Sequence, residues 1–149
     1  MAQTTGHMTS KHSTVEVAAD CLNYTDISGS SNKFDPTGGE HEVGTTYTYE
    51  GYQALVALGR IGPFTGTLTA VYTEIDTEAA DLLMGFYENQ DRICIRHRPD
   101  GAGAGKWEFI YSVFITGPIN PMTDATSSDI IIKDVPWIGT LSSWGPQAT

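Results

Sequence analysis

Alternating apolar and polar positions mark two long β-strands in this chain. In residues 64–73 the even positions carry Phe64, Leu68, Ala70 and Tyr72, and threonines fill most of the odd ones. In residues 106–116 every odd position is apolar, from Trp107 to Ile115. Because successive side chains of a strand point to opposite faces, each segment predicts a strand with one face toward a core.

Shorter runs rich in β-branched and aromatic residues predict further strands at 15–24, 45–49 and 93–98. A last strand is predicted in two parts, 130–135 and 138–141, with Pro136 marking an edge or a bulge. Turn-forming residues gather at 26–32, 35–39 and 99–105, and a polar loop is expected at 123–129. Strands that follow one another through such turns favour antiparallel sheets.

One segment has helical periodicity. Apolar residues recur at i, i+3, i+4 and i+7 in Ala79, Leu82, Leu83 and Phe86, which predicts an amphipathic helix over 76–90. Asp76 or Thr77 is the expected N-cap. The apolar stripe must be buried against the rest of the fold.

These elements predict a single mainly β (α+β) domain over residues 15–141, an antiparallel two-sheet β-sandwich flanked by one α-helix. Residues 1–14 are polar and are expected to form a flexible N-terminal arm, and residues 142–149 a C-terminal tail. An extended loop is expected at about 35–62. It contains an apolar run, 54–58, which is typical of a loop that packs on a partner.

Composition adds two constraints. The chain has 149 residues, enough for one core, and its seven tyrosines and 16 glycines suit strands and turns. Its net charge of −10 disfavours direct binding to nucleic acid or to anionic membranes.

No apolar run approaches the ~20 residues of a membrane span, and no secretion signal precedes residue 14, so we expect synthesis in a cytoplasm and no membrane insertion. In that compartment Cys21 and Cys94 are expected to be free, buried thiols.

No motif indicates catalysis, a metal or a cofactor. The four histidines, His7, His12, His41 and His97, lack metal-ligand spacing. No serine stands in a nucleophile elbow, and the apolar neighbours of both cysteines raise rather than lower a thiol pKa. The paired carboxylates, Glu40 with Glu42 and Asp124 with Asp129, lie in turn-rich segments and are best interpreted as solvated. An enzyme is therefore not expected.

Half of the eight basic side chains gather on one predicted hairpin: Arg92, Arg96, Arg98 and Lys106. On so acidic a chain, one interpretation is a contact with an acidic surface of another copy. The other interpretation is local charge balance on a solvated hairpin.

The order of these elements resembles the major tail tube proteins of phages with long, non-contractile tails. The resemblance covers about residues 15–141 and is carried by segments 25–30, 39–44, 47–52 and 71–74, the helix that follows, the aromatic strand from Lys106, and Gly117-Pro118-Ile119. Two departures from the family are that its usual long β-hairpin loop here holds the apolar stretch 54–58, and that no appended C-terminal domain is expected.

What the resemblance implies is a structural subunit that self-assembles into stacked rings, usually of six, around a channel for genome delivery. The loop at 35–62 would reach the next ring, and the partners would be identical copies, a tape-measure protein, and tail terminator or tip proteins, with DNA in transient passage. The location would be the virion tail tube. Expected self-assembly residues are Glu40, Glu42, Tyr47, Tyr49, Leu55 and Leu58 on the loop, and Arg92, Arg96, Arg98 and Lys106 on the basic hairpin.

A monomeric β-sandwich binding module, such as a carbohydrate-binding domain, is the alternative. Trp107, Trp137 and Trp144 would supply its stacking platform. The alternation places Trp107 on the core face, which weakens this interpretation.

Overall fold

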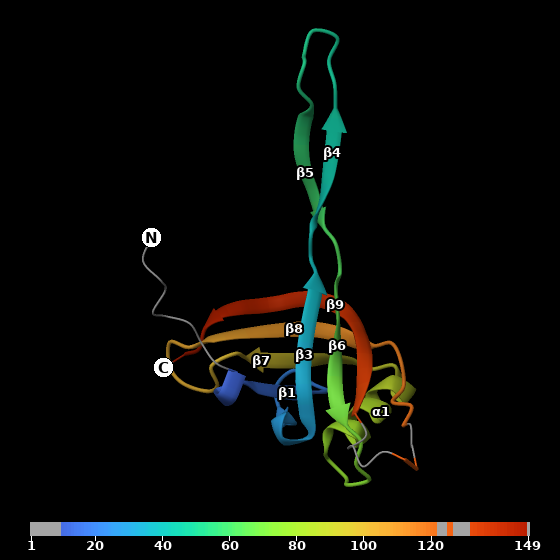
Figure 1. The fold of residues 1–149 in the computed structure, drawn as a ribbon. Coiled ribbons are helices and arrows are strands. Elements are labelled where there is room, and N and C mark those ends of the chain that lie inside the picture. Colours follow the sequence, from blue (N-terminus) through green and yellow to red (C-terminus); the bar gives the residue numbers. More distant parts are fainter. Residues whose placement is uncertain (1–9, 122–124, 127–131, 149) are drawn as a thin grey trace.

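The computed structural model describes residues 10–121, 125–126 and 132–148. Figure 1 shows a compact β body with a narrow two-stranded ribbon standing out of it. The strands are β1 (Thr14–Ala18), β2 (Thr25–Asp26), β3 (Ser31–Gly38), β4 (His41–Thr46), β5 (Leu55–Ile61), β6 (Phe64–Val71), β7 (Arg92–Arg98), β8 (Trp107–Ile115) and β9 (Ile132–Pro146). One α-helix, α1 (Ala79–Asn89), and two 3-10 turns, η1 (Ser10–His12) and η2 (Ser28–Ser30), complete the elements.

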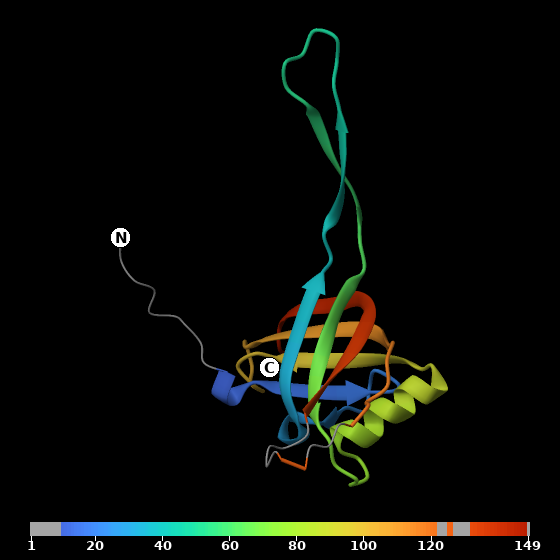
Figure 2. The same cartoon turned by 45° about the vertical axis from the view of Figure 1, so that its right-hand side comes forward.

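The strands form two antiparallel sheets. Seven strands are hydrogen-bonded in the order β2-β1-β7-β8-β9-β6-β3, and β4 pairs with β5 in the second sheet. The long strand β9 forms a corner, because its first part pairs with β6 (Val71 opposite Ile132) and its last part with β8 (Trp107 opposite Pro146). As a result β3 and β6 cross over β1, β7 and β8 (Figures 1 and 2). The predicted mainly β class with one helix and two antiparallel sheets is confirmed.

The core lies between the crossing layers. Phe34 on β3 stacks on Trp137 of β9 with ring centroids 5.5 Å apart and touches Tyr111 of β8 edge-on at 5.6 Å. Gly139 makes the corner possible, since a Cβ there would lie 2.0 Å from the carbonyl oxygen of Ser112. Two strands therefore approach at a point where no side chain fits.

Helix α1 buries the predicted stripe. Ala79 and Leu83 have no exposed surface, and Leu82 and Phe86 pack against the same core. The predicted N-caps are wrong, because the helix begins later and Glu78 occupies the cap position without a side-chain hydrogen bond. The N–H of Ala79 instead donates to Ser30 Oγ at 2.9 Å, a cap supplied from 49 residues away that no local pattern reveals.

Several predicted boundaries are wrong. The first strand ends at Ala18, and the Asp20 carboxylate then accepts the N–H groups of Leu22 and Asn23 in a local turn. The turn predicted at 35–39 is the end of β3, where Pro36 is tolerated because β3 is an edge strand. Residues 10–14, expected in the arm, form η1 and the start of β1, and Ser13 Oγ donates to Pro99 O at 2.6 Å. Residues 1–9, and most of the predicted loop at 123–129, lie outside the described residues.

The last strand is longer than predicted. β9 continues through Pro136, which sits where β8 ends, and runs to Pro146. Residues 142–146, expected in the tail, are therefore in the sheet. The next residue, Gln147, is buried against the 99–105 loop, where its side-chain amide donates to Gly101 O at 2.8 Å and accepts from Gly103 N at 3.1 Å.

The cysteine prediction is also wrong. Cys21 and Cys94 form a disulfide, with their Cα atoms 5.1 Å apart. Because Ala18 pairs with Cys94 across β1 and β7, the turn after Ala18 brings Cys21 back over Cys94. Pairing register, which the sequence does not display, decides this contact. Within the described residues no helix is long and apolar enough to cross a membrane.

Candidate self-assembly surface

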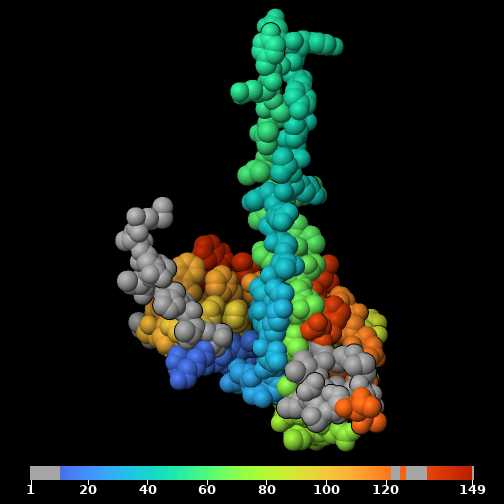
Figure 3. Space-filling view, in the orientation of Figure 1, coloured from blue at the N-terminus to red at the C-terminus, as the bar shows by residue number. Residues whose placement is uncertain are grey.

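The most unusual surface of the molecule is the β4–β5 ribbon. It continues β3 and β6 beyond the body, and two hydrogen bonds fix its base: Gly39 N–H donates to Pro63 O at 3.1 Å, and Gly62 N–H to Glu40 O at 2.8 Å. Above the base every residue of β4 and β5 is exposed. In the space-filling view the ribbon stands out of the body (Figure 3).

The two faces of the ribbon differ. Residues that stand opposite each other across two strands share a face, so the pairs Val43–Leu58 and Thr45–Val56 form one face of bulky side chains. The pairs Gly44–Ala57 and Thr46–Leu55 form the other face, which has little side-chain bulk at Gly44 and Ala57. Val43, Val56 and Leu58 are each more than 60% exposed. A two-stranded ribbon of this kind is marginal alone, and its apolar surface indicates a partner.

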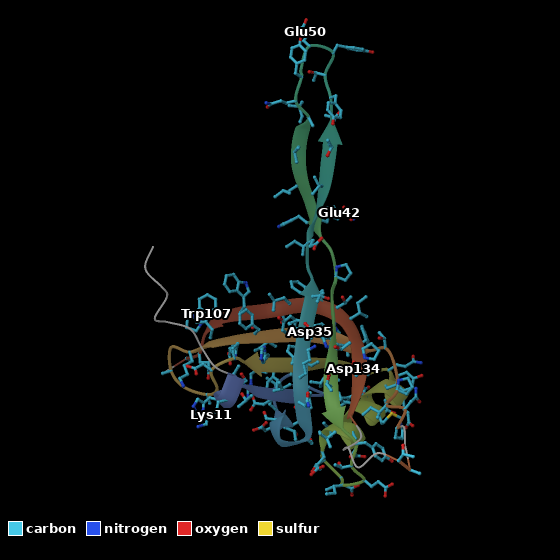
Figure 4. All side chains as sticks on the ribbon, in the orientation of Figure 1. Lys11, Asp35, Glu42, Glu50, Trp107 and Asp134 are labelled. Atoms are coloured by element: carbon cyan, nitrogen blue, oxygen red, sulfur yellow. A yellow bond between two sulfur atoms is a disulfide. The ribbon has the colours of Figure 1, made fainter. Side chains whose placement is uncertain are left out.

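Tyrosines crowd the tip of the ribbon, between β4 and β5. Tyr47 is 72% exposed, and Tyr49 and Tyr52 are as exposed as isolated side chains. Glu50 stands at the tip (Figure 4). Aromatic side chains are the commonest anchors of protein interfaces, and here they have no cover from their own chain.

Unlike the ribbon residues, the inner arginines of the basic hairpin are paired with side chains of their own chain. Arg96 bonds Glu16 through Nε and lies 3.9 Å from the ring centre of Tyr24, and Arg98 Nε lies 3.1 Å from the Glu108 carboxylate. The hydrogen bond with Glu16 raises the pKa of Arg96. These arginines are mostly shielded from solvent, with side chains 20% and 17% exposed. Their charges are thus compensated within the chain.

Arg92 and Lys106 are the outer members of the same hairpin. Arg92 Nε donates to Ser112 Oγ at 2.7 Å, and its guanidinium lies over Phe114. Lys106 Nζ lies 3.5 Å from the Asp100 carboxylate and is 42% exposed. The six predicted residues of the loop, Glu40 to Leu58, are therefore gathered on the ribbon, and the four basic residues lie on the body.

The outer edge of strand β3 is a second candidate contact surface. Among the described residues it pairs with β6 alone, so its other edge presents free backbone groups. A hollow of about 600 Å³ separates this edge from the start of β1 and is lined by residues that include Lys11, Lys33, Phe34 and His97. An open edge of this length is a site for pairing with another chain.

The histidines and paired carboxylates of the sequence do not gather into a group in the described part of the chain. There, no three His, Cys, Asp or Glu side chains converge as metal ligands. His41 Nδ1 donates to Gly59 O at 3.1 Å within the ribbon, and His97 packs on Phe34. His7, Asp124 and Asp129 lie outside the described residues.

Comparison with known proteins gives one kind of match. No family model and no curated protein matches the sequence. A solved structure matches the fold. The chain is similar in fold to a chain of an extracellular contractile injection system, solved as its PVC sheath–tube complex in the extended state. The TM-score is 0.66, the identity is 17%, and the match covers 96% of this chain and 94% of that chain. At this identity the likeness shows the fold.

Sequence reasoning missed part of the ribbon. Val43, Tyr52 and Ile61 are exposed on it and are not among the expected contacts. The signal was present in the Thr/Tyr run 45–49 and the apolar run 54–58 on either side of Gly51, which is the pattern of a hairpin. The alternation predicts the core face for Trp107, but 46% of this side chain is exposed because that face extends past the strands that cover it.

Proposed function

We propose that this chain is a structural subunit of a tail tube, built by self-assembly, in which the β4–β5 ribbon joins one ring of subunits to the next. The ribbon carries the proposal. It is an element whose apolar side chains are exposed on both faces, so it is stabilised only when another molecule covers them. Each of these side chains contributes about 1.5–3 kcal/mol when it is fully buried.

Two further observations support the proposal. The same fold occurs in a chain of a sheath–tube complex. The free edge of β3 allows sheets of neighbouring subunits to join, which removes the edge as an aggregation hazard. Ribbon and edge are different surfaces, as an assembly with contacts within and between rings requires.

The finer parts of the proposal concern the whole assembly. Six copies form each ring, the rings stack, and the channel conducts the genome of a phage with a long, non-contractile tail. A charge of −10 on each of six copies gives about −60 per ring, which repels DNA and lets it slide. The subunit is made in the host cytoplasm, and a tape-measure protein and tail terminator or tip proteins are its partners besides itself.

The test is to remove the ribbon and keep the body. Residues 40–61 are replaced by Asn-Gly, which closes a tight hairpin between β3 and β6, where Gly39 already contacts Pro63. A matched control exchanges Glu88 for alanine on the outer surface of α1. We expect the shortened chain to keep its circular dichroism spectrum and melting temperature but to remain monomeric in light scattering. The intact chain and the control should form large particles.

Two outcomes would contradict the proposal. If the shortened chain assembles as readily as the intact chain, the ribbon is not the joining element. If the intact chain stays monomeric at high concentration in every salt tried, self-assembly itself is wrong.

The alternative of a monomeric carbohydrate-binding module is weaker than the sequence suggested. Trp137 is 1% exposed and cannot contribute to a platform. Trp107 and Trp144 remain exposed with ring centroids 5.2 Å apart, but their planes are tilted by 32°. A glycan array that returns a specific, Trp107-dependent hit from monomeric protein would favour this alternative.

A further inference from the structure

The aromatic surface around Trp107 is a core face that its own chain leaves uncovered. Along β8 the inward-facing positions change from buried at Val113 and Tyr111, through half-buried at Phe109, to 46% exposed at Trp107. On the neighbouring strand β9, Trp137 is buried and Trp144 is 62% exposed. Both strands extend past the cover that β3 and β6 provide, and Trp107 points outward at that end of the body (Figure 4).

A small hollow adjoins this patch. It measures about 340 Å³ and is lined mainly by apolar atoms of Pro99, Asp100, Gly105, Lys106, Trp107 and Phe109. The loop that forms its wall is held in place, because Gln147 bonds both Gly101 and Gly103 and Lys106 Nζ donates to Asp100 O at 3.0 Å. The hollow is therefore preformed and large enough for one aromatic ring.

The ribbon tip has the complementary features. It presents tyrosines whose rings are fully exposed, and a tyrosine fits a hollow that is apolar inside and charged at its rim. The charges are compatible with this contact. The ribbon carries Glu40, Glu42 and Glu50 against Arg60 alone, and the rim of the hollow carries the Lys106–Asp100 ion pair, which is neutral overall and so does not repel the acidic ribbon.

We propose that the tip of the β4–β5 ribbon of one copy docks on the Trp107–Trp144 patch of a second copy, with a tip tyrosine in the hollow beside Lys106. This rests on the proposed function and names the receiving surface for the ribbon. Within one chain the contact cannot form, since Glu50 at the tip and Trp107 on the body lie far apart (Figure 4). Two different patches that meet between copies make a head-to-tail contact, which propagates.

The test measures the lowest protein concentration at which assemblies sediment. Trp107→Ala removes the patch, Tyr49→Ala with Tyr52→Ala removes the anchors, and Phe114→Ala is the matched control, an exposed aromatic residue elsewhere on β8 that is 40% exposed. We expect the first two changes to raise the threshold at least 10-fold and the control less than threefold. Because they remove the same contact, combining them should add little to either alone.

A proximity measurement makes the test independent of folding losses. The pair Tyr49→Cys and Lys106→Cys, placed on separate chains that are then mixed, should cross-link between copies under mild oxidation. The pair Tyr49→Cys and Glu88→Cys should not. If Trp107→Ala and Phe114→Ala shift the threshold equally and the first pair does not cross-link, the receiving surface is misassigned, and ribbon-dependent assembly still stands. A chain with intact ribbon and patch that never assembles overturns both proposals.

Discussion

The disulfide between Cys21 and Cys94 should stabilise the fold substantially. It closes a loop over a sequence separation of 73 residues. Closing a loop of that length lowers the entropy of the unfolded chain by about 15 cal/mol/K, which corresponds to about 4 kcal/mol at 25 °C. For a domain of this size, with a urea m-value of about 2 kcal/mol/M, reduction should lower the unfolding midpoint by about 2 M.

The assay is urea unfolding followed by tryptophan fluorescence, with and without a reducing agent. The matched control is the double variant Cys21→Ser, Cys94→Ser, which should unfold at the midpoint of the reduced wild type and be indifferent to the reductant. Thiol titration of the denatured, unreduced wild type should find no free thiol. Two titratable thiols would refute the disulfide between Cys21 and Cys94. Equal unfolding midpoints for the oxidised and reduced forms would refute its stabilising effect.

Three further predictions concern the core. Leu83→Ala should lower the free energy of unfolding by about 2–5 kcal/mol, because Leu83 has no exposed surface, and Leu83→Asp should prevent folding; denaturant titration checks both. Gly139→Ala should lower the free energy of unfolding by at least about 1–3 kcal/mol, because the added Cβ would lie against β8. Gly85→Ala has open space around its Cβ on the helix and should raise the melting temperature. Burial lowers the pKa of His97 from its ordinary 6.5, so the folded chain disfavours the protonated ring. The stability that neutral His97 supports is complete above pH 6.5 and is lost as the pH falls below it, and His97→Gln should flatten a plot of melting temperature between pH 7 and pH 5.

The strands and the helix were predictable where one periodicity acts alone. Residues 64–73 and 106–116 alternate because one side of each strand faces the core, and the stripe around Leu83 repeats every three or four residues because the helix packs on one side only. Each of these patterns lies within one segment, so it can be recognised without knowing which segments pair.

Long-range pairing was not predictable in the same way. The cap of α1 comes from Ser30, and the partner of Cys21 is set by the register of β1 on β7. Pro36 and Pro136 suggested interruptions, but each lies where one neighbouring strand is missing or ends, so a proline costs little.

The ribbon was hidden for another physical reason. Neither face of β4 and β5 meets a core in the monomer, so the segment lacks the strict alternation of a half-buried strand. Its apolar run 54–58 was recognisable in the sequence, but the length and register of the two paired strands were not. A segment without a core face leaves a weaker periodic pattern than one that packs on a core.

Negative-stain electron microscopy of the purified, concentrated chain tests the central claim most directly. The account predicts rings or hollow tubes of uniform diameter from the intact protein and only small single particles after residues 40–61 are replaced. Single small particles from the intact protein in all conditions, or tubes that persist without the ribbon, would contradict it.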